Sequence, residues 1–190
     1  MTATEHIALV DEEDNFLGTA EKLFVHEQGL CHRAFSVFIF RQGLTTELLL
    51  QQRARGKYHS PLLWTNTCCS HPRPDEDIVA AGERRLLEEM GMTTPLEWVG
   101  KFHYIAHFEN GLIENEVDHV LVGFLTDPVF KVNPEEVAAT RWITLPDLKD
   151  EMTRTPDQFT PWLKQALAQL EMHYLAAPLT SSRGLSAGSS

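Results

Sequence analysis

The chain has 190 residues, of which 43% are hydrophobic, and a formal net charge of −11 at pH 7. This length and apolar content are enough for one sizeable core and short for two, so we expect a single domain. The negative charge argues against a surface that binds nucleic acid or an anionic membrane, because both need net positive patches. An anionic substrate would have to be held by a local cluster of bases or by metal ions.

The cysteines and the first residues indicate a cytoplasmic protein. An odd number of cysteines, Cys31, Cys68 and Cys69, forms no disulfide framework and suits a reducing compartment. No apolar run approaches the roughly 18 residues that a membrane span needs, and the start lacks the features of a secretory signal. We therefore expect a small-molecule substrate and neither a nucleic-acid nor a membrane partner. The sequence is silent on oligomeric state, for which a monomer or weak homodimer is the working expectation.

The first half of the chain predicts mostly strands. In order, these are strands at 5–10 and 16–20, which form a hairpin, a short helix at 22–28 that ends at Gly29, and strands at 34–40 and 47–53. The last strand leads into a basic segment, which is either a solvated loop or an anion clamp: Arg53, Arg55 and Lys57, followed by Tyr58 and His59.

The second half alternates helices and strands. It predicts a helix at 75–91, a hairpin of strands at 98–108 and 113–125 around Asn110-Gly111, a strand at 141–145, a short helix at 146–152 and an amphipathic helix at 160–174. Residues 177–190 are small and polar, which predicts a disordered tail and leaves residues 1–176 as the domain.

Reactive residue types converge at residues 64–74. If residues 66–71 are extended, Thr67, Cys69 and His71 share one face and Asn66, Cys68 and Ser70 the other. Cys69 is the better candidate for a reactive thiol, because a nearby imidazole or metal lowers a thiol pKa. The alternative is that both cysteines are small buried apolar residues.

Several ionisable residues lie at the edges of predicted elements. Arg85 and Glu89 share a row beside the buried edge of the helix, although a surface i,i+4 pair is the alternative. Glu114 and Glu116 share a face of a strand, which is either its solvated side or the mouth of a site. Mixed imidazoles and carboxylates suit Mn²⁺ or Zn²⁺, although a lone histidine is more often structural. The candidate ligands are His26, His32, His71, Glu114 and Glu116.

Five stretches carry a family resemblance: His-Arg-Ala-Phe-Ser-Val-Phe-Ile-Phe (32–40), Leu-Leu-Leu-Gln-Gln-Arg (48–53), Gly-Lys-Tyr-His-Ser (56–60), Leu-Trp-Thr-Asn-Thr-Cys-Cys-Ser-His-Pro-Arg-Pro (63–74) and Glu-Asn-Glu-Val (114–117). Over about residues 4–175 the chain resembles type 1 isopentenyl-diphosphate isomerase, of the Nudix superfamily. The resemblance implies a Nudix-type fold of the α+β or α/β class. Such a fold has a mixed central β-sheet flanked by helices, here with an N-terminal hairpin addition.

The helix predicted at 75–91 looks like a degenerate Nudix box. Glu76, Arg84, Leu86, Glu88, Glu89 and Gly91 keep the expected spacing. Ser70 replaces the opening glycine of the box, and Arg85 replaces the glutamate that should follow Arg84. These losses disfavour phosphate-bond hydrolysis and fit an isomerase on the same fold. Pro61-Leu62 stands where relatives often carry Gly-Gly, and Asp75 where they often carry glycine, so we expect a differently shaped loop.

The resemblance implies an enzyme of isoprenoid biosynthesis that interconverts isopentenyl and dimethylallyl diphosphate by protonation and deprotonation of the alkene. It implies catalytic roles for Cys69 and Glu116, with Tyr104 assisting Glu116, and leaves open which is acid and which is base. It implies a divalent metal, Mn²⁺, Mg²⁺ or Zn²⁺, on the five candidate ligands, and a second Mg²⁺ that arrives with the diphosphate at Glu89 and the Cys69 carbonyl. It also implies a substrate pocket made of the diphosphate-binding bases Lys22, Arg53, Lys57 and Arg85 and the aromatic lid Trp162.

Two other classes remain as alternatives. A Nudix hydrolase would use the box and Mg²⁺ to cleave a nucleoside diphosphate derivative. A non-catalytic metal-binding domain would need the histidines and glutamates but not Cys69. Neither explains Cys69 and Trp162 together with the broken box.

Overall fold

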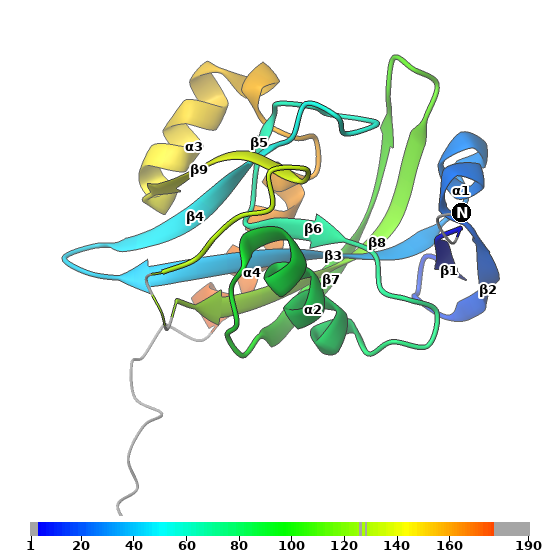
Figure 1. Cartoon of the computed structure of the whole chain (residues 1–190), viewed down its shortest axis with the longest axis horizontal. Coiled ribbons are helices and arrows are strands. Elements are labelled where there is room, and N and C mark those ends of the chain that lie inside the picture. The colour runs from blue at the N-terminus through cyan, green and yellow to red at the C-terminus, as the bar shows by residue number, and fades with distance from the viewer. Residues whose placement is uncertain (1–3, 126, 128, 177–190) are drawn as a thin grey trace, which may run out of the picture.

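The computed structural model describes residues 4–125, 127 and 129–176; the tail predicted at 177–190 lies outside them. Within the described residues one mixed sheet contains β1 (His6–Val10), β2 (Phe16–Glu21), β3 (His32–Gln42), β4 (Thr46–Arg53), β5 (Trp64–Thr65), β6 (Cys68–Ser70), β7 (Glu97–His107), β8 (Ile113–Phe124) and β9 (Val137–Ile143). The helices are α1 (Lys22–Gln28), α2 (Ile78–Met90), α3 (Leu145–Arg154) and α4 (Leu163–Ala176), with a 3-10 turn, η1, at Pro156–Gln158. This mixed sheet flanked by helices confirms the predicted fold class (Figure 1).

Strand β3 is the centre of the sheet because it pairs with four other strands. It runs parallel to β8, from His32 opposite Glu116 to Phe40 opposite Phe124. It runs antiparallel to β1, β4 and β6. The same segment of β3 pairs with β6 on one edge and with β8 on the other, so Ser36 lies opposite both Cys69 and Val120. Strands β6 and β8 therefore flank β3.

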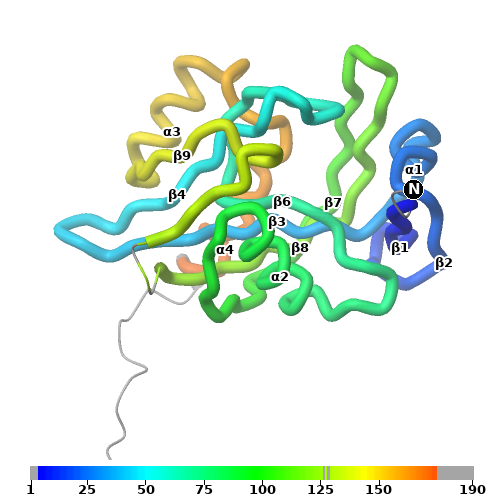
Figure 2. The backbone as a smooth tube through the Cα atoms, viewed as in Figure 1, coloured from blue at the N-terminus to red at the C-terminus, as the bar shows by residue number. Residues whose placement is uncertain are grey.

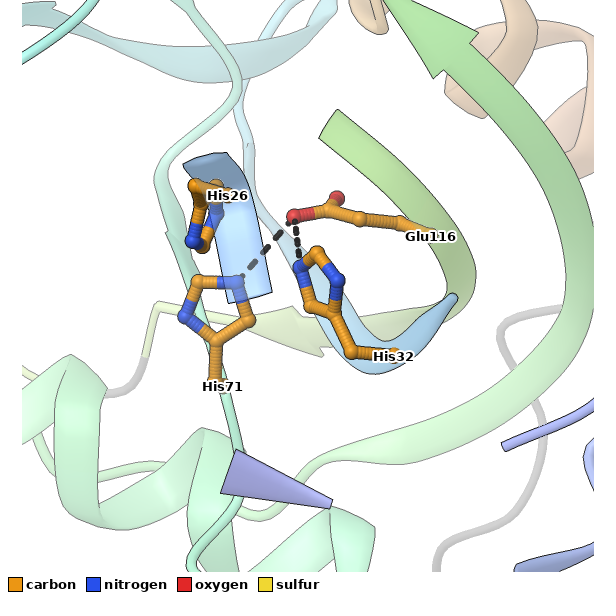
Figure 3. Close-up of side chains that lie close together, drawn as sticks. All are labelled: His26, His32, His71 and Glu116. Carbon is orange, nitrogen blue, oxygen red and sulfur yellow. Dashed lines mark hydrogen bonds and ion pairs between the residues drawn. The ribbon is translucent and has the colours of Figure 1, made fainter. Parts of the chain in front are cut away.

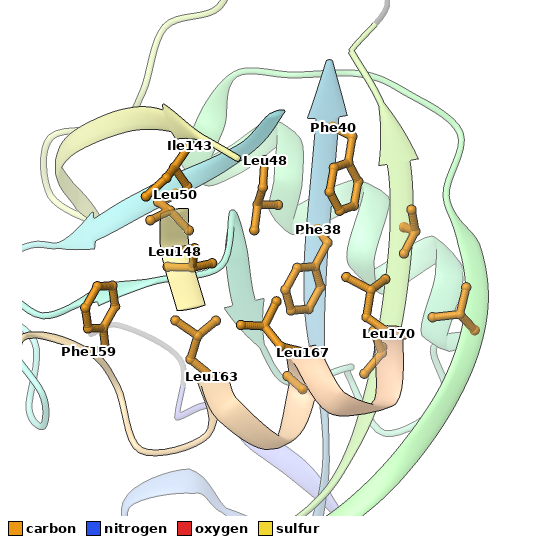
Figure 4. Packing of buried hydrophobic residues seen from close by; sticks show 14 residues of the cluster. Phe38, Phe40, Leu48, Leu50, Ile143, Leu148, Phe159, Leu163, Leu167 and Leu170 are labelled. Carbon is orange, nitrogen blue, oxygen red and sulfur yellow. The ribbon is translucent and has the colours of Figure 1, made fainter. Parts of the chain in front are cut away.

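Side chains of the central strands alternate between two hydrophobic clusters. Phe38 and Phe40 lie in the cluster that α3 and α4 cover (Figure 4), whereas Val37 and Ile39 lie in the cluster that α2 covers. A strand covered on both faces reads as a continuous apolar run, which explains the run predicted at 34–40. Leu86 and Met90 of α2 are fully buried against this second cluster.

The predicted N-terminal hairpin is formed by β1 and β2, and α1 follows it and ends at Gly29 with a left-handed φ of 65°. This segment lies beside the β7–β8 hairpin (Figure 2). Asp14 in the β1–β2 turn fixes it to the sheet. Its Oδ1 accepts a hydrogen bond of 2.7 Å from Arg33 Nε, and its Oδ2 lies 2.9 Å from His119 Nε2.

Two helices begin later than predicted, because local side chains satisfy their first backbone groups differently. Helix α2 begins at Ile78 rather than near residue 75, since the Asp77 carboxylate accepts from the backbone N–H groups of Val79 and Ala80. Helix α4 begins at Leu163, and the Thr160 hydroxyl donates to Thr65 Oγ1 at 2.8 Å. Among the described residues, no helix is both long and apolar enough to cross a bilayer.

Two turns have residues in left-handed backbone conformations. In the β7–β8 turn the Gly111 N–H donates to the Phe108 carbonyl at 3.0 Å, so Glu109 and Asn110 are the central residues and Gly111 follows with φ 85°. In the Pro61-Leu62 loop, Leu62 has a left-handed φ of 62°. A leucine in this conformation is strained by roughly 1–2 kcal/mol, so a glycine at this position would relieve the strain.

Candidate active site

A single pocket over β3 collects side chains from elements that are far apart in sequence. It encloses a cavity of about 120 Å³. Glu114, Glu116 and Asp118 point into it together because alternate residues of β8 share a face. Its other functional side chains come from α1, β4 and the β4–β5 loop, β6 and the segment after it, α2, the segment before β9 and the segment before α4: Lys22, Arg53, Lys57, His59, Cys69, His71, Arg85, Glu89, Glu136 and Trp162.

Three histidines and one glutamate form a buried group with the geometry of a metal site. The candidate ligand atoms of His26, His32, His71 and Glu116 all lie within 4.8 Å of one another (Figure 3). The Nε2 atoms of His32 and His71 each lie 3.1 Å from Glu116 Oε1. The parallel register of β3 and β8, which puts His32 opposite Glu116, brings this group together.

The second nitrogens of two of the three imidazoles also fit metal binding. His26 Nδ1 lies 2.7 Å from the Lys22 carbonyl and His32 Nδ1 lies 2.8 Å from the Leu30 carbonyl, so each ring is oriented with Nε2 toward the group. Metal-binding histidines are commonly held by such carbonyl contacts. His71 Nδ1 is buried without a hydrogen-bond partner among the described residues. Imidazoles and a carboxylate suit a divalent ion of the first transition row.

Glu114, predicted as a fifth ligand, lies outside this group. Its Oε1 lies 2.8 Å from His59 Nε2, and its Oε2 accepts a hydrogen bond from the Tyr104 hydroxyl. Tyr104 was expected to assist Glu116, but its hydroxyl contacts Glu114 instead. Burial and the neighbouring charge of Glu116 raise the pKa of Glu114. Burial also disfavours the ionised form of Glu116, but the hydrogen bonds from His32 and His71 outweigh it and hold the pKa of Glu116 well below its usual range.

The Cys69 thiol is surrounded by polar groups at the edge of the pocket. It donates to Asn66 Oδ1 at 3.0 Å and accepts from Trp162 Nε1 at 3.2 Å. Burial raises the pKa of Cys69 to about 12, so the group is a thiol at neutral pH. The expectation that His71 lowers this pKa is wrong, because burial lowers the pKa of His71 to about 3 and its ring carries no positive charge.

The alternation predicted for residues 66–71 is only partly correct. Cys68 is fully buried in the apolar cluster beneath α2, whereas Cys69 lines the pocket with His71, as predicted. However, Asn66–Thr67 interrupts the strand between β5 and β6. The Thr67 hydroxyl therefore donates to the Leu49 carbonyl in the core, and Asn66 lies on the side of Cys69.

All four predicted diphosphate-binding bases line the pocket. Arg53 is 6% exposed, and its Nε is buried without a partner among the described residues. Lys57 Nζ contacts Glu136, and Arg85 contacts Glu89. Lys22 Nζ lies 3.0 Å from Glu5 Oε2. The four bases lie together although the chain as a whole is acidic. They form the local cluster of positive charge that an acidic protein needs in order to bind an anion.

Glu89 and Arg85 form the expected i,i+4 pair, but it is not a solvated surface pair because Glu89 is only 2% exposed. Glu89 also accepts a hydrogen bond of 3.2 Å from Gln51 Nε2. The remaining residues of the degenerate box hold the helix in place, since Arg84 Nε donates to Glu76 Oε1 at 2.6 Å. Glu89 is thus the carboxylate of the box that reaches the pocket.

Trp162 is 3% exposed and precedes α4 rather than lying within its first turn. Its indole N–H points to Cys69 Sγ and to Asn66 Oδ1, 3.3 Å away. The ring lies 5.4 Å from the Arg53 guanidinium and edge-on to His59, with 5.9 Å between the ring centroids. Trp162 therefore closes one side of the pocket next to the thiol.

The sequence reasoning assigned no role to several polar residues of the pocket. The two-residue period of β8 would have found Asp118, which is 2% exposed and accepts from Ser36 Oγ at 2.7 Å. Sequence pattern carries no comparable signal for the other residues, because loops bring them into the site: His59, Asn66 and Glu136.

Comparisons with known proteins agree with this fold. Residues 31–163 match the NUDIX domain model. A protein of Deinococcus radiodurans, DR0079, superposes with a TM-score of 0.66 at 16% identity, covering 86% of this chain and 98% of that one. A MutT protein of Methanosarcina mazei superposes with a TM-score of 0.58 at 15% identity, covering 75% and 94%. At such identities the superpositions speak for the fold alone, and fold and domain match together define a Nudix protein.

Relatives with similar sequences identify the family to which this chain belongs within the Nudix class. Isopentenyl-diphosphate Delta-isomerase of Aliivibrio fischeri is 46% identical over 90% of this chain and 97% of that protein. The enzymes of that name from Serratia proteamaculans and Pectobacterium atrosepticum are 49% and 43% identical, over 87% and 96% of this chain and 91% and 100% of theirs. The chain belongs to the isopentenyl-diphosphate Delta-isomerase family.

Proposed function

We propose that this protein interconverts isopentenyl diphosphate and dimethylallyl diphosphate. The observation that carries the proposal is that the Cys69 thiol and the Glu116 carboxylate line the same pocket as the four bases. Moving the double bond requires a proton to be added to the terminal methylene of the alkene and another to be removed from C2. The pocket therefore needs one acid and one base that face the same hydrocarbon, beside a cluster that binds the diphosphate.

The two proposed catalytic groups lie on strands that flank β3, with Cys69 on β6 and Glu116 on β8. A substrate lying over β3 would have one group on each side. The raised pKa of Cys69 keeps the thiol protonated and the lowered pKa of Glu116 keeps the carboxylate ionised, so the resting pair contains one acid and one base. Tyr104, through its contact with Glu114, orients the carboxylates of β8.

Protonation of the alkene creates positive charge at the tertiary carbon, and the pocket has a group suited to it. We propose that the Trp162 ring covers the hydrocarbon, where an aromatic face stabilises a desolvated cation by roughly 2 kcal/mol. Because the Trp162 side chain is buried, it also excludes water, which would otherwise react with the cation.

The buried imidazole and carboxylate group would hold a divalent metal, for which we propose Mn²⁺, Mg²⁺ or Zn²⁺ on His26, His32, His71 and Glu116, with Glu114, oriented by His59, as a further ligand. A bound metal supplies fixed positive charge that orients Glu116 and alters its acidity. Glu89 would ligate a second ion, Mg²⁺, that arrives with the diphosphate, and Lys22, Arg53, Lys57 and Arg85 would hold the phosphate oxygens.

The hydrolase alternative is not favoured, because Arg85 replaces a box glutamate and its guanidinium contacts Glu89 instead. The alternative of a non-catalytic metal-binding domain does not explain why polar groups surround the Cys69 thiol. The test is incubation of the protein with Mg²⁺ and isopentenyl diphosphate, followed by analysis for the acid-labile allylic product, with the Cys69→Ala variant as control. Release of phosphate from nucleoside diphosphates with no allylic product would contradict the proposal.

A further inference from the structure

Glu136 brings a carboxylate into contact with two bases of the pocket. Its Oε2 accepts a hydrogen bond from Lys57 Nζ, and its Oε1 lies 3.5 Å from Arg85 Nη2. None of the motifs that carry the family resemblance includes Glu136. A carboxylate in this position competes with an incoming anion for the same two cations.

The backbone keeps Glu136 in this position. Its N–H donates to the Asn133 carbonyl at 3.0 Å, and its carbonyl accepts from the Ala54 N–H at 3.0 Å, in the loop that carries Lys57. The Asn133 N–H in turn donates to the Glu89 carbonyl at 2.8 Å, at the end of α2. The main chain of Glu136 is thus tied to the elements that carry both bases, so its carboxylate remains at the pocket when an anion binds.

The charges around Glu136 suit an anion only when a cation accompanies it. The Arg53 guanidinium is buried in the pocket, and its Nε has no partner among the described residues, so this N–H can donate to an incoming anion. When Lys57 turns to that anion, Glu136 loses one of its two cations and faces added negative charge, which is unfavourable in a partly desolvated site. Glu89 and Glu136, which both contact Arg85 Nη2, would then be two oxygen donors suited to Mg²⁺.

We propose that Glu136 makes the pocket selective for a diphosphate that carries Mg²⁺ over the metal-free diphosphate. The carboxylate repels the free anion and attracts the cation of the complex, so a single group favours one form and disfavours the other. This inference rests on the proposed function, in which the four bases and Glu89 bind the diphosphate. It adds a residue that decides which ionic form of the diphosphate binds.

The test is calorimetric titration with inorganic pyrophosphate at neutral pH, with and without saturating Mg²⁺, for the wild type and Glu136→Gln. The wild type should bind far more tightly with Mg²⁺. In Glu136→Gln the affinity without Mg²⁺ should rise and the affinity with Mg²⁺ should fall, so that their ratio drops by about tenfold or more. The matched control is Glu135→Gln, which removes the same charge from the exposed neighbouring residue and should keep the wild-type ratio.

A Glu136→Gln variant that binds both forms more tightly by the same factor would overturn the inference, since that is the effect of lowering overall negative charge. Equal affinities of the wild type for both forms would also overturn it. A thermal melt of each variant shows whether glutamine at this position disturbs the fold. If it does, the same two titrations are made with Glu136→Ala. Failure of the wild type to isomerise isopentenyl diphosphate, with the predicted pyrophosphate ratios intact, would overturn the proposed function and leave this inference standing.

Discussion

His59 Nε2 lies 2.8 Å from Glu114 Oε1, and both side chains are almost fully buried beside the metal-site group. The His59 ring is stacked on Phe108, with 4.6 Å between ring centroids, and edge-on to Trp162. His59 therefore links the carboxylate proposed as a metal ligand to the tryptophan proposed as a lid.

We predict that His59→Leu weakens divalent metal binding by about tenfold or more, because the partners that orient a metal ligand contribute to affinity on this scale. Burial already raises the pKa of Glu114, so losing His59 leaves its carboxyl more often protonated. Competition with a chromogenic chelator measures the affinity. His107→Leu, at the exposed end of β7, is the control. Unchanged affinity in His59→Leu would show that Glu114 binds the metal without this partner.

Substitution of Cys69 should affect activity, whereas substitution of Cys68 should affect stability. Cys69→Ala should lower isomerisation by about 10²–10⁴-fold, the usual contribution of an acid or base. Cys68→Ala should retain turnover and lose about 1 kcal/mol of unfolding free energy, because Cys68 is fully buried in the core. Turnover and denaturant unfolding of both variants decide the matter. Equal activity loss in the two would contradict the assignment of the thiol.

Diphosphate binding should weaken as the pH rises through about 8. Burial, together with the charges of Arg53 and Arg85, lowers the pKa of Lys57 to about 8, although Glu89 opposes this shift. The lysine is charged below this pH and loses its proton above it, so its attraction for the anion is present at neutral pH and lost in alkali. Pyrophosphate affinity measured across this range should fall in the wild type and stay nearly constant in Lys57→Arg. The same alkaline fall in both proteins would assign it to another group.

Trp162→Phe should retain much of the turnover, because it keeps an aromatic face, whereas Trp162→Leu should be slower by about thirtyfold relative to phenylalanine. Both variants lose the indole N–H bond to Cys69, so their comparison isolates the ring. Melting temperatures are measured alongside. Losses of activity that follow melting temperature in both variants would show that Trp162 serves packing alone.

Local sequence pattern alone predicted most of the helices and strands and several of the residues that line the site. The apolar run at 34–40, the Asn-Gly turn region and the glycines after α1 and α2 were predictable because they reflect short-range backbone and burial preferences. The two-residue period of β8 predicted that Glu114 and Glu116 share a face but not whether that face is solvated, and both residues line the buried pocket. A two-residue period likewise separated Cys68 from Cys69. The family motifs supplied the identities of the bases, which all reach the pocket.

Only the tertiary structure decided how these groups pair. The β3–β8 register puts His32 against Glu116, while the β4–β5 loop brings His59 to Glu114, so the two glutamates have different histidine partners. The protonation of Cys69 was likewise beyond the sequence, since a thiol pKa depends on burial and on whether its neighbouring imidazole is charged. Such contacts join residues that are distant in the chain, and local preference carries no information about which distant partner a side chain will meet.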